Sequence, residues 1–364
     1  MSWQPAFTTK IEDPVSIANL LKPKQTTPNP PSKPITISIV GAGQRGSVYA
    51  RYTKIEPQWA KVVAVAEPVE HRRRMMAELY NIPEENVFTD WEEMIKRPKL
   101  SDAVIIATFD NLHIKPAIEF ANKKYNILLE KPMADTIKSC KEITNTVLEN
   151  KIVCAVGHVL RYTPHNTLIK SIIDGGYLGN IVNIQHVEPV GEWHFAHSKI
   201  SSFGSLMHFN SKNKPKEAGD AKNCFDCKVE PTCPYSAKKI YIDNCFNKGV
   251  VSWPVNVITD VVVNMQFSNG ATANITMIAY TEAICERKCN GVNEIKYYNF
   301  LTRKKEILTP TEILGVNDLS GHAGGDMALM RSFIYNVNEF KESLKNAPNE
   351  QSNIHLTTGI KQTF

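Results

Sequence analysis

Short apolar runs alternate with amphipathic segments through the first half of the chain. The runs are ITISIV, KVVAVAE, AVIIAT and NILLEK, which begin at residues 35, 61, 103 and 126. Segments with helical spacing follow these runs and begin near Arg45, Val69, His113 and Asp135. This alternation is typical of βαβ units that build a parallel sheet. With a further run, IVCAVGHV from residue 152, it predicts a doubly wound α/β domain over residues 35–158.

The pattern changes after about residue 180, where alternating runs indicate strands of another kind of sheet. Residues 180–190, 261–267 and 271–280 form such runs, and Ser268-Asn269-Gly270 joins the last two. Asn-Gly between alternating runs is a strong hairpin signal. Residues 326–345 place their apolar side chains on one helical stripe. We therefore expect a second domain of α+β class, with a largely antiparallel sheet, over residues 159–364.

Prolines dominate the stretch before the first apolar run. Residues 22–34 hold five prolines and almost nothing apolar, so residues 1–34 are expected to form a flexible leader. The formal net charge of +5 is small for 364 residues and the basic runs are scattered, which argues against a nucleic-acid partner. No apolar stretch is long enough to span a membrane, and the first residues lack a secretion signal. The sequence therefore predicts a cytoplasmic protein whose eight cysteines are reduced.

The motif Gly41-Ala-Gly43-Gln44-Arg45-Gly46 directly follows the first predicted strand and precedes a predicted helix. In that context the three glycines have separate functions: a tight turn, room for a pyrophosphate against the backbone, and close packing of helix on strand. The phosphates would lie at the helix N-terminus. The motif predicts a Rossmann domain whose glycines, Gln44 and Arg45 bind a dinucleotide. The alternative is a glycine turn that binds nothing.

Glu67 ends the second predicted strand, 21 residues after Gly46. An acidic side chain at this place can accept hydrogen bonds from both ribose hydroxyls of the adenosine half, which favours NAD. The three arginines Arg72, Arg73 and Arg74 follow one helical turn later and could instead neutralise the 2′-phosphate of NADP. The sequence favours NAD and keeps NADP as the alternative.

Polar side chains follow the ends of three more predicted strands. Because the carboxyl ends of strands in a doubly wound sheet form the ligand crevice, these side chains are expected to lie together there. Each also has a structural alternative, such as a helix cap at His113. The residues expected to contact the cofactor are Thr108, Asn111, His113, Glu130, Lys131, His158 and Arg161.

Several of these residues belong to motifs that resemble one known family. Glu130-Lys131-Pro132, GAGQRG, AEP at residues 66–68, Asn111-x-His113 and GHVLRYTP from Gly157 are similar to those of the Gfo/Idh/MocA family. That family is named for glucose-fructose oxidoreductase, inositol dehydrogenase and rhizopine catabolism. The resemblance covers residues 35–345. It implies NAD(P)-dependent hydride transfer to or from a hydroxyl or carbonyl of a sugar, cyclitol or related small molecule.

The resemblance also implies catalytic residues. It places Lys131 against the substrate hydroxyl, with Glu130 beside it, and we expect the lysine to be shielded from water so that it can serve as base or proton relay. Pro132 is a candidate for a cis peptide bond. The family's Asp/His constellation from an early helix of the second domain has no counterpart here. The one literal Asp-x-x-x-His match is Asp318 to His322, which makes His322 a further catalytic candidate.

Two places in the second half differ from the pattern that the resemblance implies. Additional sequence is expected after Ser198 and after Asp260, and a further element is expected beyond the last residues, so the second sheet is expected to be incomplete. The alternative function is accordingly a dinucleotide-binding pseudoenzyme, or a truncated product that lacks the Asp/His segment. Family members assemble through the second-domain sheet, which makes a homo-oligomer an expectation as well.

Four cysteines in the Lys- and Pro-rich middle of the chain have a spacing that could bind zinc. Cys224 and Cys227 form a CxxC pair, and Cys233 and Cys245 follow at looser spacings. Four thiolates would order an exposed loop around a structural zinc ion. The alternative is that these cysteines are ordinary reduced thiols.

Overall fold

The chain forms two compact units in the computed structural model. The structure describes residues 16–22, 29–191, 204–205, 216–221, 227–232, 260–281, 294–299, 304–317 and 319–346. The first unit contains the described residues up to 168, residues 304–306 and those from 310 onward, and the second contains the described residues of 169–299 and residues 307–309. In the part of the chain that is described, no helix is long and apolar enough to cross a membrane.

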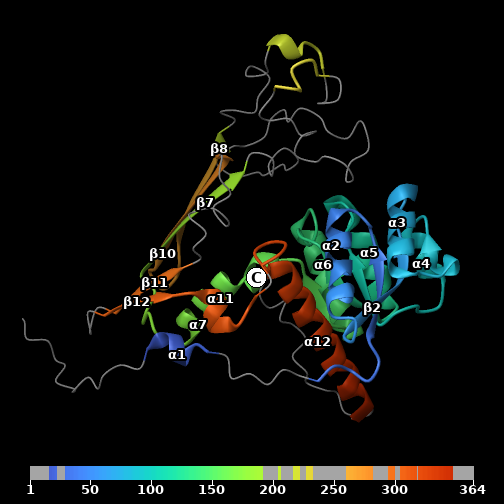
Figure 1. The fold of residues 1–364 in the computed structure, drawn as a ribbon, viewed down its shortest axis with the longest axis horizontal. Coiled ribbons are helices and arrows are strands. Elements are labelled where there is room, and N and C mark those ends of the chain that lie inside the picture. Colours follow the sequence, from blue (N-terminus) through green and yellow to red (C-terminus); the bar gives the residue numbers. More distant parts are fainter. Residues whose placement is uncertain are drawn as a thin grey trace, which may run out of the picture. The chain divides into compact units, whose positions relative to one another are not determined.

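The first unit is built on a six-stranded sheet in which all neighbouring strands are parallel. Figure 1 shows the helices that gather around this sheet. Its spatial order is β3-β2-β1-β4-β5-β6. The strands are β1 (Ile35–Val40), β2 (Ala60–Ala66), β3 (Val87–Phe88), β4 (Ala103–Ile106), β5 (Asn126–Leu129) and β6 (Cys154–Val156). The order reverses between β1 and β4, which is where a doubly wound sheet opens a crevice at the carboxyl ends of its strands. The predicted Rossmann architecture is confirmed, and β3 is the strand that the sequence did not predict.

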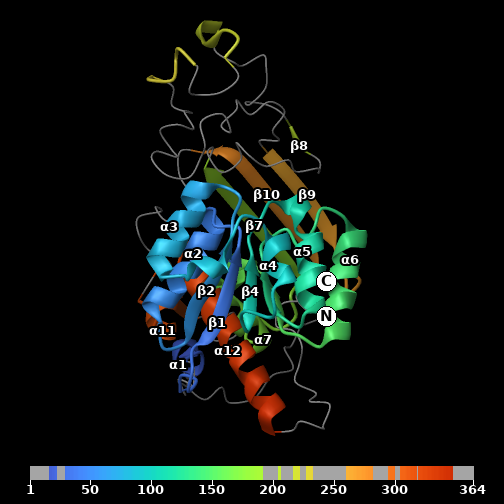
Figure 2. The same ribbon diagram turned by 90° about the vertical axis from the view of Figure 1, so that its right-hand side faces the viewer.

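Helices cover both faces of this sheet (Figure 2). The helices are α2 (Gln44–Ile55), α3 (Glu70–Tyr80), α4 (Trp91–Lys96), α5 (Ile114–Asn122), α6 (Ile137–Asn150) and α12 (Gly325–Asn346). α2, α3 and α12 share one core with β1, whereas α4, α5 and α6 share the other. Ala103 and Ile105 of β4 enter the first core, and Val104 and Ile106 enter the second. A strand buried on both faces must be apolar throughout, which explains the unbroken run in the sequence.

The helix α12 lies in the first unit, although the sequence assigned everything after residue 158 to the second domain. Its apolar stripe is the predicted one, and each member of it is buried in the core beneath α2. These side chains are Met327, Leu329, Met330, Phe333, Ile334 and Val337. The second unit is therefore an insertion between the sixth strand of the Rossmann sheet and its last helix.

The second unit contains a four-stranded sheet in the order β7-β10-β9-β8. Its strands are β7 (Asn183–Gly191), β8 (Gly204–Ser205), β9 (Asp260–Gln266) and β10 (Thr272–Thr281). The hairpin between β9 and β10 is confirmed, and Gly270 has the positive φ of +86° that its turn requires. β8 and β9 are also antiparallel, but β7 pairs with β10 in parallel, so the sheet is only mostly antiparallel.

The remaining described elements are short. They are α1 (Ile17–Leu20), α7 (Pro164–Asp174), α11 (Pro310–Leu314), the 3-10 turns η1 (Glu84–Asn86), η2 (Asp110–Leu112), η3 (Val159–Tyr162) and η4 (Lys216–Ala218), and the paired strands β11 (Ile295–Tyr298) and β12 (Lys305–Leu308). α1 lies inside the expected leader, where Ile17 is buried and the Ser16 hydroxyl donates to the Glu306 carboxylate at 2.7 Å. The sequence did not predict this helical turn.

Asp102 links three elements at the amino edge of the Rossmann sheet. Its carboxylate accepts hydrogen bonds from the Thr36 backbone N–H at 2.9 Å, the Thr36 hydroxyl at 2.8 Å and the Lys341 ammonium at 2.6 Å. Partial burial acts to raise the pKa of Asp102, but the bonds from Lys341 and Thr36 outweigh it and hold the pKa below its usual value. β1, β4 and α12 are therefore joined through one ionised side chain.

We expect Asp102→Asn to lower the free energy of unfolding by about 1.5–3 kcal/mol at pH 7, the range for lost hydrogen bonds to a charged group. Because the folded pKa lies below the unfolded one, this contribution is present above the unfolded value of about 3.9 and is lost as the pH falls through the folded value. Urea unfolding at pH 7 and at pH 3 measures both effects, with Asp135→Asn as the exposed control. A difference between variant and unmodified chain that is equally large at pH 3 would contradict the assignment.

Candidate functional site

The glycine loop lies at the carboxyl edge of the sheet, between β1 and α2. Gly41 has φ +91°, and a Cβ at that position would lie 2.6 Å from the Ala107 carbonyl oxygen at the end of β4. A Cβ at Gly46 would collide with the Gly41 carbonyl oxygen. At Gly43, by contrast, a Cβ would meet only the Arg72 guanidinium, at 3.9 Å. The outer glycines are thus required by the fold, whereas Gly43 leaves its backbone open at the N-terminus of α2.

Glu67 follows β2 and braces this loop. Its buried carboxylate accepts hydrogen bonds from the backbone N–H groups of Ala42 at 2.7 Å and Val69 at 2.9 Å. Each carboxylate oxygen can accept a second hydrogen bond, so the ribose contact expected of Glu67 stays a prediction. Of the arginines that follow, Arg73 donates to the Glu67 and Pro68 carbonyls and Arg74 pairs with Glu84. The Arg72 guanidinium lies beside the loop, 3.9 Å from a Cβ built at Gly43.

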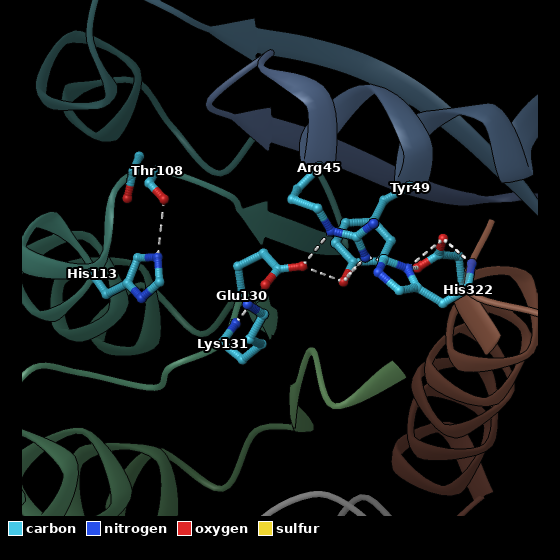
Figure 3. A network of polar contacts seen from close by, with 8 residues as sticks. Arg45, Tyr49, Thr108, His113, Glu130, Lys131 and His322 are labelled. Atoms are coloured by element: carbon cyan, nitrogen blue, oxygen red, sulfur yellow. Dashed lines mark hydrogen bonds and ion pairs between the residues drawn. The ribbon is translucent and has the colours of Figure 1, made fainter. Parts of the chain in front are cut away.

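Thr108 and His113 occupy the loop after β4 (Figure 3). The Thr108 hydroxyl oxygen is buried and has no hydrogen-bond partner within the described residues. His113 is fully buried, and its two ring nitrogens lie 2.8 Å from the Pro132 carbonyl oxygen and 3.2 Å from that of Thr108. The histidine therefore joins two loops of the crevice, and the cofactor contact that the sequence expected of it stays a prediction.

Glu130, after β5, is a buried carboxylate at the centre of a polar network (Figure 3). One of its oxygens accepts from the Arg45 guanidinium at 2.7 Å and from the Tyr49 hydroxyl at 2.6 Å. The other accepts from the backbone N–H of Lys131 at 2.7 Å. Burial and the neighbouring Glu130 carboxylate raise the pKa of Tyr49, which keeps its hydroxyl protonated as a donor. A Cβ at Gly157 would lie 3.2 Å from the Glu130 carboxyl carbon, so the glycine makes room for this group.

Asp326 holds the other side of the Arg45 guanidinium, at 2.7 Å. Burial acts to raise the pKa of Asp326, but hydrogen bonds from His322 and Arg45 hold it well below its usual range. The His322 ring nitrogen Nδ1 lies 3.1 Å from both Asp326 oxygens, and the His322 backbone N–H donates to one of them. The partner of His322 is therefore Asp326, four residues later, whereas the predicted partner Asp318 lies outside the described residues.

Lys131 is the first residue beyond the buried carboxylate, and its side chain is exposed. The sequence predicted a lysine shielded from water, but β5 ends at Leu129 and the chain leaves the sheet directly before Lys131. The peptide bond between Lys131 and Pro132 is cis, as predicted.

The last predicted cofactor residues lie on short turns at the same edge. His158 is half-buried and directly precedes η3. Burial and the positive charges of Arg161 and Lys131 lower its pKa, and they outweigh the Glu130 carboxylate, which acts to raise it. Its imidazole therefore stays neutral near pH 7. Arg161 in η3 and Asn111 in η2 are both exposed, as is Gln44 at the start of α2.

The predicted zinc ligands are mostly not described. Cys224, Cys233 and Cys245 lie outside the described residues, and Cys227 is half-buried with a free thiol. Among the residues that the structure does describe, no group of three or more His, Cys, Asp or Glu side chains is arranged to hold a metal ion. The structure thus gives the zinc hypothesis no support.

Two residues of the network were not among the sequence candidates. Tyr49 lies one helical turn after Arg45 and donates to Glu130, so the i, i+4 spacing on a predicted helix was a usable signal. Asp326 belongs to the segment GHAGGD, but it is about 280 residues from Arg45 in sequence. Only the return of α12 to the first unit brings the two together.

The first domain is similar to one known family. Residues 35–158 match the model of the Gfo/Idh/MocA oxidoreductase family, described as an NAD-binding Rossmann fold. The chain is 31% identical over 150 residues to a 2,7-anhydro-N-acetylneuraminate hydratase of Mediterraneibacter gnavus, and 26% identical over 187 residues to an inositol 2-dehydrogenase of Rubrobacter xylanophilus. These matches cover 41% and 49% of this chain. It spans only 38% and 53% of the length of those two relatives.

Solved structures extend the likeness of fold over more of the chain. An inositol dehydrogenase homologue from Azotobacter vinelandii, solved with NAD+, superimposes with a TM-score of 0.57 at 16% identity, over 87% of this chain and 88% of its own. Identity at this level shows a shared fold and no more. Together with the family match and the glycine loop it supports one conclusion: residues 35–158 form a Rossmann domain that matches the NAD-binding Rossmann fold of the Gfo/Idh/MocA oxidoreductase family.

Proposed function

We propose that this chain is an NAD-dependent oxidoreductase that transfers hydride to or from a hydroxyl or carbonyl of a sugar, cyclitol or related small molecule. The observation that carries the proposal is the division of roles within the glycine loop. Gly41 and Gly46 are required because a Cβ at either position would collide with backbone atoms. Gly43 has no such neighbour, so its lack of a side chain leaves the N-terminus of α2 accessible. An open helix N-terminus beside a parallel sheet is suited to a pyrophosphate.

The residues around the loop fit the remainder of a nicotinamide dinucleotide. Glu67 has acceptor capacity beside the loop for ribose hydroxyls. The Thr108 hydroxyl after β4, which has no partner among the described residues, can bond a polar group of a ligand. A bound nicotinamide would accept hydride from the carbon that carries the substrate hydroxyl, or return it. No other cofactor chemistry is needed for the proposed reaction.

The proton that accompanies hydride transfer is assigned to Lys131. Once bound cofactor and substrate shield it from water, its Nζ would take the proton of the substrate hydroxyl in oxidation and return it in reduction, as general acid–base catalysis requires. Glu130 holds the backbone of Lys131 and leaves its side chain free to reach a substrate. His158, half-buried and neutral, is available at the same edge as a hydrogen-bond partner for a substrate hydroxyl.

The substrate class follows from the relatives as a proposal only. One similar protein is named a dehydrogenase of inositol and another a hydratase of an anhydro sugar acid, and both names describe polyhydroxylated molecules. NAD is preferred to NADP in the proposal because of Glu67, although Arg72 lies near the loop. A cytoplasmic location and a homo-oligomer assembled through the second sheet stay predictions from the sequence.

We expect NADH to bind with a Kd of micromolar order and Gly43→Val to abolish binding, because the added side chain fills the space above the helix N-terminus. Gly43 has an ordinary negative φ of −70° and no close neighbour, so the variant should keep its fold and its circular dichroism spectrum. Titration by nicotinamide fluorescence is the measurement. If the unmodified chain and Gly43→Val bound NADH with equal affinity, the glycine loop would not be part of the cofactor site.

We expect Glu67→Ala to reduce the preference for NADH over NADPH by about 1.5–3 kcal/mol, the range for lost hydrogen bonds to a charged group. Both affinities should fall as well, because the Ala42 N–H loses its acceptor. Competition titrations with the two cofactors give the ratio. A preference that survives the substitution unchanged would mean that Glu67 only braces the loop, and Arg72→Ala would then be the informative variant.

We expect Lys131→Ala to lower kcat by about 10²–10⁴-fold with little change in NADH affinity, because a positioned acid–base group contributes a factor of that size. The assay is reduction of NAD in a panel that includes myo-inositol, scyllo-inositol and levoglucosan, with the neighbouring exposed Lys138→Ala as control. Retained turnover in Lys131→Ala would refute the assignment. NADH binding without turnover of any polyol in the unmodified chain would instead favour a dinucleotide-binding pseudoenzyme.

A further inference from the structure

We infer that Asp326, at the start of α12, is a positioning residue for Lys131, and that it acts through Arg45 and Glu130. The inference rests on the proposed function, because Lys131 is the proton-transfer group of that proposal. It adds a residue from the far end of the sequence to the site. No motif of the first domain contains this residue.

The connection is continuous in hydrogen bonds (Figure 3). Asp326 accepts from Arg45 Nη2 at 2.7 Å, and Arg45 Nε donates to Glu130 at 2.7 Å. The second oxygen of Glu130 accepts from the backbone N–H of Lys131 at 2.7 Å. The path from Asp326 to Lys131 therefore passes through the side chains of Arg45 and Glu130, and each of these is hydrogen-bonded to the residue before it and the residue after it in the path.

The geometry of the guanidinium makes this path stiff. An arginine fork is planar, and two carboxylates bound at different nitrogens fix both its position and its rotation. Arg45 is anchored to Glu130 through Nε and to Asp326 through Nη2, while Tyr49 accepts a further bond from Nη2. Without Asp326, the guanidinium would keep contacts on the Glu130 side only and could rotate about its own side chain.

Asp326 is itself held in one place. Its side chain is 1% exposed, and it accepts from the backbone N–H and the ring nitrogen of His322. A Cβ at Gly321 would collide with the Asp326 carboxylate, so the glycine leaves space for this one rotamer. A carboxylate confined in this way can transmit the position of α12 to Arg45.

The alternative is that Asp326 only anchors α12. A second ion pair of the same helix has that anchoring function alone and serves as the control. Lys341 of α12 pairs with Asp102 at 2.6 Å, at the amino edge of the sheet. Asp102 has no part in the crevice and also joins α12 to the Rossmann sheet. Asp102→Asn therefore weakens the attachment of α12 without touching the path to Lys131.

The test compares Asp326→Asn with Asp102→Asn in the full chain. The dimethylamino resonances of reductively ¹³C-methylated protein report on each lysine, and the signal of Lys131 is identified by its loss in Lys131→Arg. We expect Asp326→Asn to move this resonance and Asp102→Asn to leave it in place, although both lower the melting temperature. With a polyol that the unmodified chain oxidises, kcat should fall up to about 100-fold in Asp326→Asn with KM little changed, as for a misplaced reacting group.

An unmoved Lys131 resonance in folded Asp326→Asn would overturn the inference, as would equal shifts in both variants. If Asp326→Asn does not fold, Arg45→Lys carries the same test, because a lysine keeps the charge but cannot bridge the two carboxylates as a planar fork. The lysine resonance does not depend on turnover. A chain that binds no NADH but shows the shift would therefore refute the proposed function and leave the positioning path standing.

Discussion

The Arg45 guanidinium lies between two buried carboxylates at the carboxyl edge of the Rossmann sheet. The segments that meet at this edge are held together through it. The Arg45 guanidinium lies 2.7 Å from both the Glu130 and the Asp326 carboxylates, so its positive charge compensates for their burial. Removal of one partner from a buried pair leaves an uncompensated charge, at a cost of about 3–5 kcal/mol. The same residue ties the glycine loop, the strand that ends before Lys131 and the last helix to one another. The loop that would hold the cofactor and the lysine that would move the proton thus share one support.

Much of the first unit could be predicted from the sequence because its signals are local. Strands buried on both faces must be apolar, and the glycine loop needs glycine where φ is positive or where helix and strand touch, as at Gly41 and Gly46. The Asn-Gly hairpin of the second unit is another local signal. β3 was missed because two residues are too few to carry an alternating pattern. The parallel pairing of β7 with β10 was missed because it joins strands that are far apart in the sequence, and no local pattern indicates it.

The candidate site was predictable only in part, for the same reason. Position at a strand end predicted that Thr108, Glu130 and Lys131 lie at the carboxyl edge of the sheet, where the structure has them, but it could not show that His113 holds two loops together. The sequence paired His322 with Asp318, which lies outside the described residues, and the structure shows a contact of His322 with Asp326. That contact was not predicted, because Asp326 reaches the site only through the entry of α12 into the first unit.

The insertion of the second unit also has a consequence for synthesis of the protein on the ribosome. A nascent chain that has reached Val156 contains every strand of the Rossmann sheet, but the apolar side chains of α12 that complete one of its two cores are not yet made. Met327 lies 171 residues further on, a delay on the order of 10–30 s at bacterial or eukaryotic rates of translation. During that interval the face beneath α2 stays open to water, where it offers a binding surface to chaperones and to neighbouring chains.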